Sequence, residues 1–105
     1  MRKVSVAATQ MPCGWDVEEN IASAEALVRQ AHAQGAQIIL LQELFERCYF
    51  CQKQIYDYLN FATTAEDNPA IAHFRRIAAE LQVVLPISFY ERCNNAYYNS
   101  IAIID

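Results

Sequence analysis

The chain of 105 residues carries 8 basic and 12 acidic residues, which gives a formal net charge of −4, and 54% of its residues are hydrophobic. This length corresponds to one domain, and the apolar share predicts a globular protein with a buried core. The basic residues are scattered, which argues against nucleic acid as a partner, because a phosphate backbone attracts clustered positive charge. No run approaches the roughly 18 apolar residues of a membrane span, so we expect no membrane partner and a cytoplasmic location.

The first part of the chain predicts a β-α-β order. Lys3–Gln10 is short and rich in small and β-branched residues, as is typical of a strand. A helix is predicted over Asp16–Gln34, because Asp16 and Glu19 form a capping box and apolar residues recur at three- and four-residue steps. Gly35 follows where a left-handed C-terminal cap is expected. Gln37–Gln42 is uniformly Ile and Leu between its ends, which predicts a parallel strand covered on both faces.

Two further helices are predicted in the middle of the chain. One covers Gln52–Phe61, and the other starts after Asn68, which can cap it, with Pro69 in the first turn.

The end of the chain predicts an antiparallel hairpin. Val83–Tyr90 and Tyr97–Ile104 have strand composition, and Asn94-Asn95 between them is a turn signal. Pro86 argues for an edge position or a bulge, because proline has no N–H to donate to a neighbouring strand. The domain therefore belongs to the α/β class, and its stop at Asp105, directly after a strongly apolar strand, predicts that it is incomplete.

Cys48 and Cys51 form a C-x-x-C pair, which raises the question of a metal or a redox site. A structural zinc site needs four ligands, and the remaining candidates are single and distant in sequence, so we expect no metal. These candidates are Cys13, Cys93, His32 and His73. A redox pair would benefit from a helix starting near Gln52, but the bulky Tyr-Phe between the cysteines argues against the tight turn that it needs. Packed, inert thiols are the preferred interpretation, and a small redox protein remains an alternative.

Other familiar catalytic and cofactor patterns find no match. The first β-to-α turn, Thr9–Asp16, holds one glycine, too few for the phosphate cradle of a dinucleotide fold, and no serine stands in a G-x-S-x-G elbow. His32 and His73 are better explained as surface residues or partners of a helix dipole than as bases. We therefore expect no cofactor.

Glu43 is the strongest catalytic candidate in the residues themselves. It follows a predicted buried strand, and the carboxyl ends of such strands are where α/β sheets place ligands and catalytic groups. Beside Leu44 and Phe45 its carboxylate would be partly desolvated, which raises a pKa toward the range useful for proton transfer. The alternative is a solvated loop acid that pairs with Arg47 or a helix N-terminus. The residues alone leave both interpretations open.

Three segments carry a resemblance to a known family. "VAATQM" in the first strand, "AQIILLQELFERCYFCQ" around Glu43 and the final "ISFYERCNNAYYNSIAIID" resemble the nitrilase superfamily of carbon-nitrogen hydrolases. Within it, they look most like the members that cleave N-carbamoylputrescine in polyamine (putrescine) synthesis. The resemblance spans essentially the whole chain without a gap.

The resemblance implies an α-β-β-α sandwich and a Glu-Lys-Cys triad. In such a triad the cysteine thiolate attacks the carbonyl, the glutamate is general base and acid, and the lysine stabilises the oxyanion. Glu43 matches the glutamate, and Tyr49 matches a position that is expected to line the substrate pocket. The lysine and the nucleophile of the family lie downstream of the last strand, so Lys3, Lys53 and the four cysteines match neither.

The resemblance thus predicts that residues 1–105 are the N-terminal portion of a single carbon-nitrogen hydrolase domain. The full-length protein would hydrolyse a small carbamoyl or amide substrate and form a homo-oligomer, whereas this chain alone would be inactive. As half of a sandwich it should expose apolar surface. A truncated, non-catalytic binding or interaction module is the competing hypothesis.

Overall fold

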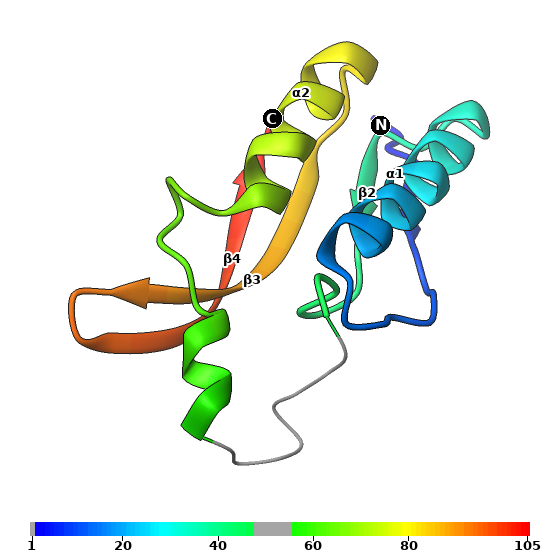
Figure 1. Ribbon diagram of the computed structural model, residues 1–105. Helices are drawn as coiled ribbons and strands as arrows, with labels where there is room; N and C mark the ends of the chain where they lie inside the picture. Colours follow the sequence, from blue (N-terminus) through cyan, green and yellow to red (C-terminus); the bar gives the residue numbers. More distant parts are fainter. Residues whose placement is uncertain (1, 48–55) are drawn as a thin grey trace.

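A computed structural model describes residues 2–47 and 56–105 of the chain (Figure 1). It contains four strands, two α-helices and one 3-10 helix in the described residues. They are β1 (Val6–Ala8), α1 (Val17–Ala33), β2 (Ile38–Leu40), the 3-10 helix η2 (Tyr56–Phe61), α2 (Pro69–Leu81), β3 (Leu85–Cys93) and β4 (Ala96–Ile104).

Helix α1 begins and ends where its capping residues predict. The backbone N–H of Glu19 donates to Asp16 Oδ1 over 3.2 Å, which satisfies a backbone donor of the first turn. At the other end Gly35 has φ +95, and the backbone N–H groups of Gly35 and Ala36 donate to the carbonyls of His32 and Ala31. This is a Schellman ending, which requires the left-handed residue that glycine supplies. The predicted helix is confirmed.

Helix α2 is set by a second cap. Asn68 Oδ1 accepts a hydrogen bond of 2.9 Å from the backbone N–H of Ile71, and Pro69 stands at the start of the helix. The helix ends at Leu81, and its C-cap Gln82 has a left-handed φ of 55. One face is apolar and buried. Its buried residues are Ala70, Ile71, Phe74, Ile77 and Ala78.

Prediction and structure differ before this helix. We expected an α-helix over Gln52–Phe61, but the described part, Tyr56–Phe61, is a 3-10 helix, and residues 52–55 lie outside the described residues. Aromatic side chains and asparagine, which make up much of this segment, have modest α-helix propensity, and short segments of this kind are common as 3-10 connectors. No helix in the described ranges is long and apolar enough to cross a membrane.

The strands form two two-stranded sheets, β1-β2 and β3-β4, and a parallel bridge between Ile38 and Val84 joins them. β1 and β2 pair in parallel, and β3 and β4 form the predicted antiparallel hairpin, in which Leu85 faces Ile104. Val84 joins the two pairs, because its N–H donates to Gln37 O over 2.9 Å and its carbonyl accepts from Ile39 N over 3.0 Å. Two residues on, Pro86 has no N–H to continue this parallel pairing. The register with β4 runs past Pro86 without a bulge, so the edge interpretation holds.

Both helices pack on one face of the strands. α1 contacts α2 and β2, and α2 contacts β3 and β4, so the core lies between the helix pair and one side of the sheet (Figure 1). Phe74 of α2 and Phe45 of the loop after β2 meet edge to face at 5.8 Å between ring centroids. From the strands, the same core takes Ile39, Leu85, Ile87, Phe89 and Ile104.

The opposite face of the sheet is open and apolar. Val6 is 70% exposed, Leu40 46%, Ile101 60% and Ile103 67%. The expectation that Gln37–Gln42 is covered on both faces is therefore wrong for the described part of this chain, because helices cover one side of it only. The expected exposed apolar surface, in contrast, is confirmed. We call the four residues above the open face.

Candidate active site

Glu43 stands at the edge of a hollow on the open-face side of the molecule. It lies three residues beyond the end of β2, and its side chain is exposed. The hollow has a volume of about 260 Å³. Its lining residues are Leu40, Leu41, Glu43, Ser88, Asn99 and Ile101. The expected partial desolvation of Glu43 is wrong for this chain, because the side of the sheet from which Glu43 projects has no covering layer in the described residues.

The loop that carries Glu43 is tied to the hairpin. The backbone N–H of Leu44 donates to Ser88 Oγ over 3.0 Å, and Ser88 Oγ donates to Asn99 Oδ1 over 3.4 Å. Leu44 has φ 49, a left-handed conformation that costs roughly 1–2 kcal/mol for a residue other than glycine. Such a conformation persists where the surroundings hold it, and it recurs at functional sites.

The same loop is tied to the segment that follows β1. Gln42 Oε1 accepts a hydrogen bond of 2.8 Å from the backbone N–H of Met11, and Gln42 Nε2 donates to the sulfur of Cys13 over 3.0 Å. Glu43 is thus flanked by two residues with anchored positions, Gln42 on one side and Leu44 on the other. Glu43 itself lines the hollow.

Glu46 anchors the loop on its inner side. Its carboxylate Oε1 accepts a hydrogen bond of 2.7 Å from Asn68 Nδ2, and its backbone carbonyl accepts one of 2.8 Å from Asn20 Nδ2. Burial raises the pKa of the Glu46 carboxyl above its ordinary value, although the bond from Asn68 and the charge of Arg47 act in the opposite direction. This second carboxylate was not among the residues singled out from the sequence.

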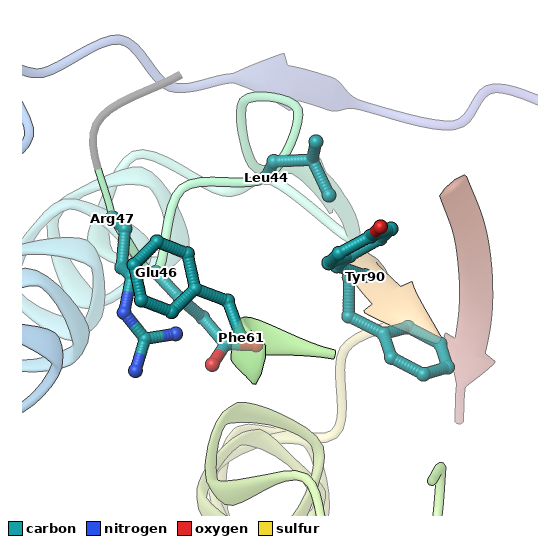
Figure 2. A pocket seen from close by; sticks show the side chains of 6 residues that line it. Leu44, Glu46, Arg47, Phe61 and Tyr90 are labelled. Carbon is teal, nitrogen blue, oxygen red and sulfur yellow. The ribbon is translucent and has the colours of Figure 1, made fainter. Parts of the chain in front are cut away.

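Glu46 and Arg47 line a small cavity beneath the loop, together with Leu44, Phe61 and Tyr90 (Figure 2). Its volume of about 10 Å³ is at the lower limit for holding one water molecule. The guanidinium of Arg47 lies 4.2 Å from the centroid of the Phe61 ring, a cation–π contact. Among the described residues Arg47 thus turns to Phe61, so the alternative of a Glu43–Arg47 ion pair is not seen.

The other candidates from the sequence fall into two groups. Tyr49, Cys48 and Cys51 lie outside the described residues, so the pocket role of Tyr49 and the redox alternative stay predictions. Cys93 is a free, exposed cysteine at the end of β3. Within residues 2–47 and 56–105 no three His, Cys, Asp or Glu side chains gather as metal ligands would.

The two histidines lie in the two α-helices. His32 lies in the last turn of α1, and His73 of α2 contacts Glu25 of α1 over 2.6 Å. Neither lines the hollow beside Glu43.

Sequence reasoning missed three further residues at this site. The sequence patterns place Ser88 and Asn99 only within predicted strands, and they assign no role to Glu46. A signal exists for Ser88, since it is a polar residue between apolar neighbours in a predicted strand and is buried to 5% exposure. For Asn99 the signal is its cross-strand position near Ser88, which the hairpin register supplies.

Comparison with known proteins relates the whole chain to one family. Residues 5–105 match the family described as carbon-nitrogen hydrolase. The chain is 56% identical over 104 residues to an N-carbamoylputrescine amidase of Oryza sativa subsp. japonica, covering 98% of this chain and 34% of the relative. It is 53% identical to an N-carbamoylputrescine amidase of Arabidopsis thaliana, covering 99% and 35%, and 41% identical to a citrullinase of Francisella tularensis, covering 100% and 37%. The chain thus spans about a third of the length of these relatives.

Solved structures agree on the fold. A carbon-nitrogen hydrolase from Helicobacter pylori G27 superposes with a TM-score of 0.83 at 25% identity, over 95% of this chain and 35% of that one. The CN-hydrolase superfamily protein XC1258 from Xanthomonas campestris gives a TM-score of 0.80 at 21% identity, over 99% and 37%. The mixed α/β arrangement described above therefore corresponds to about a third of a carbon-nitrogen hydrolase.

Proposed function

The chain belongs to the carbon-nitrogen hydrolase family, and from this premise we propose that it is the N-terminal portion of an enzyme that hydrolyses N-carbamoylputrescine. The identities of 56% and 53% to two N-carbamoylputrescine amidases support this substrate over the carbamoyl compound of the citrullinase, to which the identity is 41%. The remaining two-thirds of such an enzyme would complete the α-β-β-α sandwich.

Glu43 carries the proposed chemistry in this chain. A cysteine thiol from the downstream part loses its proton to Glu43 and attacks the carbamoyl carbon, while a downstream lysine stabilises the oxyanion. The tetrahedral intermediate collapses, Glu43 returns the proton, and ammonia leaves. Water, deprotonated by Glu43, then releases the thiol and a carbamate, which decays to carbon dioxide and putrescine.

The observation that supports this proposal most directly is the position of Glu43 on the open side of the sheet. Glu43 lines the hollow beside Leu40 and Ile101, two apolar residues that are 46% and 60% exposed. A second layer over this face would bury both and would enclose Glu43. Enclosure would expel bulk water from around the carboxylate, which strengthens its interactions with a reacting group. The base would thus become effective only in the complete domain.

Four finer expectations belong to the same proposal. Tyr49 would line the substrate pocket near Glu43. The complete enzyme would be a homo-oligomer and would act in the cytoplasm. The chain of 105 residues alone would release no ammonia, because it has no match to the triad lysine or the nucleophile.

A chimera tests the proposal. This chain is joined at Asp105 to the remaining part of the rice relative, and ammonia release from N-carbamoylputrescine is measured. We expect activity in the chimera, none in the 105-residue chain, and a loss of about 10²–10⁴-fold in Glu43→Gln, the range for a general base. Glu66→Gln, at an exposed position that does not line the hollow, is the matched control and should retain full activity. An active Glu43→Gln chimera would overturn the role of Glu43, and activity of the short chain alone would overturn its dependence on downstream residues.

A non-catalytic interaction module is the second candidate, and the open face supports it, because another chain could cover the same strands. The coding sequence downstream of Asp105 separates the two. A lysine-bearing strand and a cysteine motif there favour the enzyme, whereas a stop codon favours the module.

A further inference from the structure

We propose that Glu46 is a positioning residue for Glu43, and that it acts through its hydrogen bond with Asn68. The proposal rests on the function proposed above and adds a residue to it. Glu46 stands three positions after Glu43 on the same loop, but the two residues line different cavities. Glu43 lines the hollow on the open side of the sheet, and Glu46 lines the small cavity beneath the loop (Figure 2).

The contacts of Glu46 connect the loop to both helices. Asn20 of α1 donates to its backbone carbonyl over 2.8 Å, and Asn68 at the start of α2 donates to its carboxylate over 2.7 Å. Both asparagines are buried, at 5% and 2% exposure. Asn68 is itself fixed, because its Oδ1 caps Ile71 and its Nδ2 also donates to Thr63 Oγ1 over 2.9 Å. Glu46 thus attaches the loop to a rigid point.

Glu46 lies two residues after Leu44, the strained residue of the loop. Leu44 holds its left-handed φ of 49 while its N–H reaches Ser88 Oγ over 3.0 Å. If the loop were released at Glu46, Leu44 could relax to an ordinary conformation, and Glu43, which precedes it directly, would turn with it. A shift of about 1 Å in a catalytic group is enough to lower a rate by about 100-fold.

Burial of the Glu46 carboxylate also lowers the stability of the folded protein. A partly buried carboxylate loses hydration, and a neutral side chain of the same shape could accept the same bond from Asn68. Residues that lower the stability of a protein are expected mainly at functional sites. Glu46 fits this expectation, because its burial is unfavourable and it holds the loop that carries Glu43. Glutamine at position 46 keeps the shape and the acceptor oxygen of the side chain but removes its charge, whereas alanine removes the shape, the acceptor and the charge.

Hydrogen exchange of this chain provides the first test and does not depend on activity. We expect the Leu44 amide to exchange at least 10-fold faster in Glu46→Ala and at the original rate in Glu46→Gln. Amides in the middle of α2 should be unchanged in both. Asn68→Asp keeps the helix cap but removes the donor to Glu46, so it should match Glu46→Ala at Leu44. Faster exchange spread evenly over α1 and α2 would overturn the proposal, because it would mean general destabilisation.

Kinetics of the chimera provide the second test. We expect Glu46→Ala and Asn68→Asp each to lower kcat by at least 10-fold, with KM within twofold of the parent value. Glu46→Gln should retain the parent kcat. The double variant that combines Glu46→Ala with Asn68→Asp should be no slower than either single variant. Glu80→Ala, which removes an ion pair on the outer helical surface, is the control and should retain kcat. An active chimera with unchanged kcat in Glu46→Ala would overturn the positioning role. An inactive parent chimera would overturn the proposed function, while the exchange result at Leu44 would still decide the role of Glu46 in the loop.

Discussion

His73 of α2 lies 2.6 Å from Glu25 of α1, and this contact connects the two helices across 48 positions of the sequence. Arg29 extends the connection, because it donates to Glu25 over 2.8 Å and to Glu80 of α2 over 2.6 Å. The helix pair is thus held by charge on its outer surface as well as by the apolar core beneath it.

Acid should weaken this charge cluster. The hydrogen bonds from Arg29 and then from His73 hold the pKa of Glu25 below its ordinary value. A pKa lowered by folding stabilises the protein above the unfolded-state pKa, and this contribution is lost as pH falls through the folded-state pKa. We expect Glu25→Gln to lower the free energy of unfolding at neutral pH by less than about 1 kcal/mol, as exposed pairs do, and to have no effect in strong acid. Urea titrations at the two pH values measure this. An equal effect at both would contradict it.

Glu46 should show the opposite sign. Burial raises its pKa on folding, so its contribution to stability is complete below the unfolded-state pKa and is lost as pH rises through the folded-state pKa. Glu46→Gln is therefore expected to raise the free energy of unfolding at neutral pH and to leave it unchanged in strong acid. The same urea titrations apply, with Glu66→Gln as the exposed control. Destabilisation by Glu46→Gln at neutral pH would show that the charge itself is required.

The core should depend on the contact between Phe45 and Phe74. Both rings are fully buried, at 0% exposure, and they meet edge to face. Phe74→Ala leaves a cavity and is expected to cost about 3–5 kcal/mol, a large part of the stability of a small domain. Phe74→Leu retains most of the volume and should cost clearly less. Thermal unfolding by circular dichroism compares the two, and equal melting temperatures would contradict the packing argument.

The open face should make the chain self-associate. Ile101 and Ile103 are 60% and 67% exposed, and contiguous apolar surface of this kind drives association. We expect Ile101→Thr with Ile103→Thr to shift the chain toward a monomer in sedimentation velocity, since threonine keeps strand propensity while lowering hydrophobicity. Tyr98→Thr is the matched control, because Tyr98 is 51% exposed but projects to the other side of β4. A parent chain that is already a monomer with a sharp, cooperative melt would contradict this expectation.

The sequence by itself determined the local elements and the main catalytic candidate. Helix α1 follows from Asp16 and Gly35, and α2 from Asn68, because caps and turns act over a few residues and leave their pattern in adjacent positions. The family follows from segments that carry residue-by-residue matches. Glu43 was singled out from its place after a predicted buried strand, with Gln42 between it and the apolar run that ends at Leu41.

The tertiary structure decided what surrounds these residues. Glu46 meets Asn68 across 22 positions of the sequence, and Glu25 meets His73 across 48. The exposure of Glu43 and the covering of β2 on one face also result from the packing of the elements. No periodicity or propensity encodes such distances, since they result from how helices and strands pack once they have formed. Burial and the pKa shifts that follow from it are properties of that packing, and for this reason the sequence indicated a base at Glu43 but not the carboxylate that holds its loop.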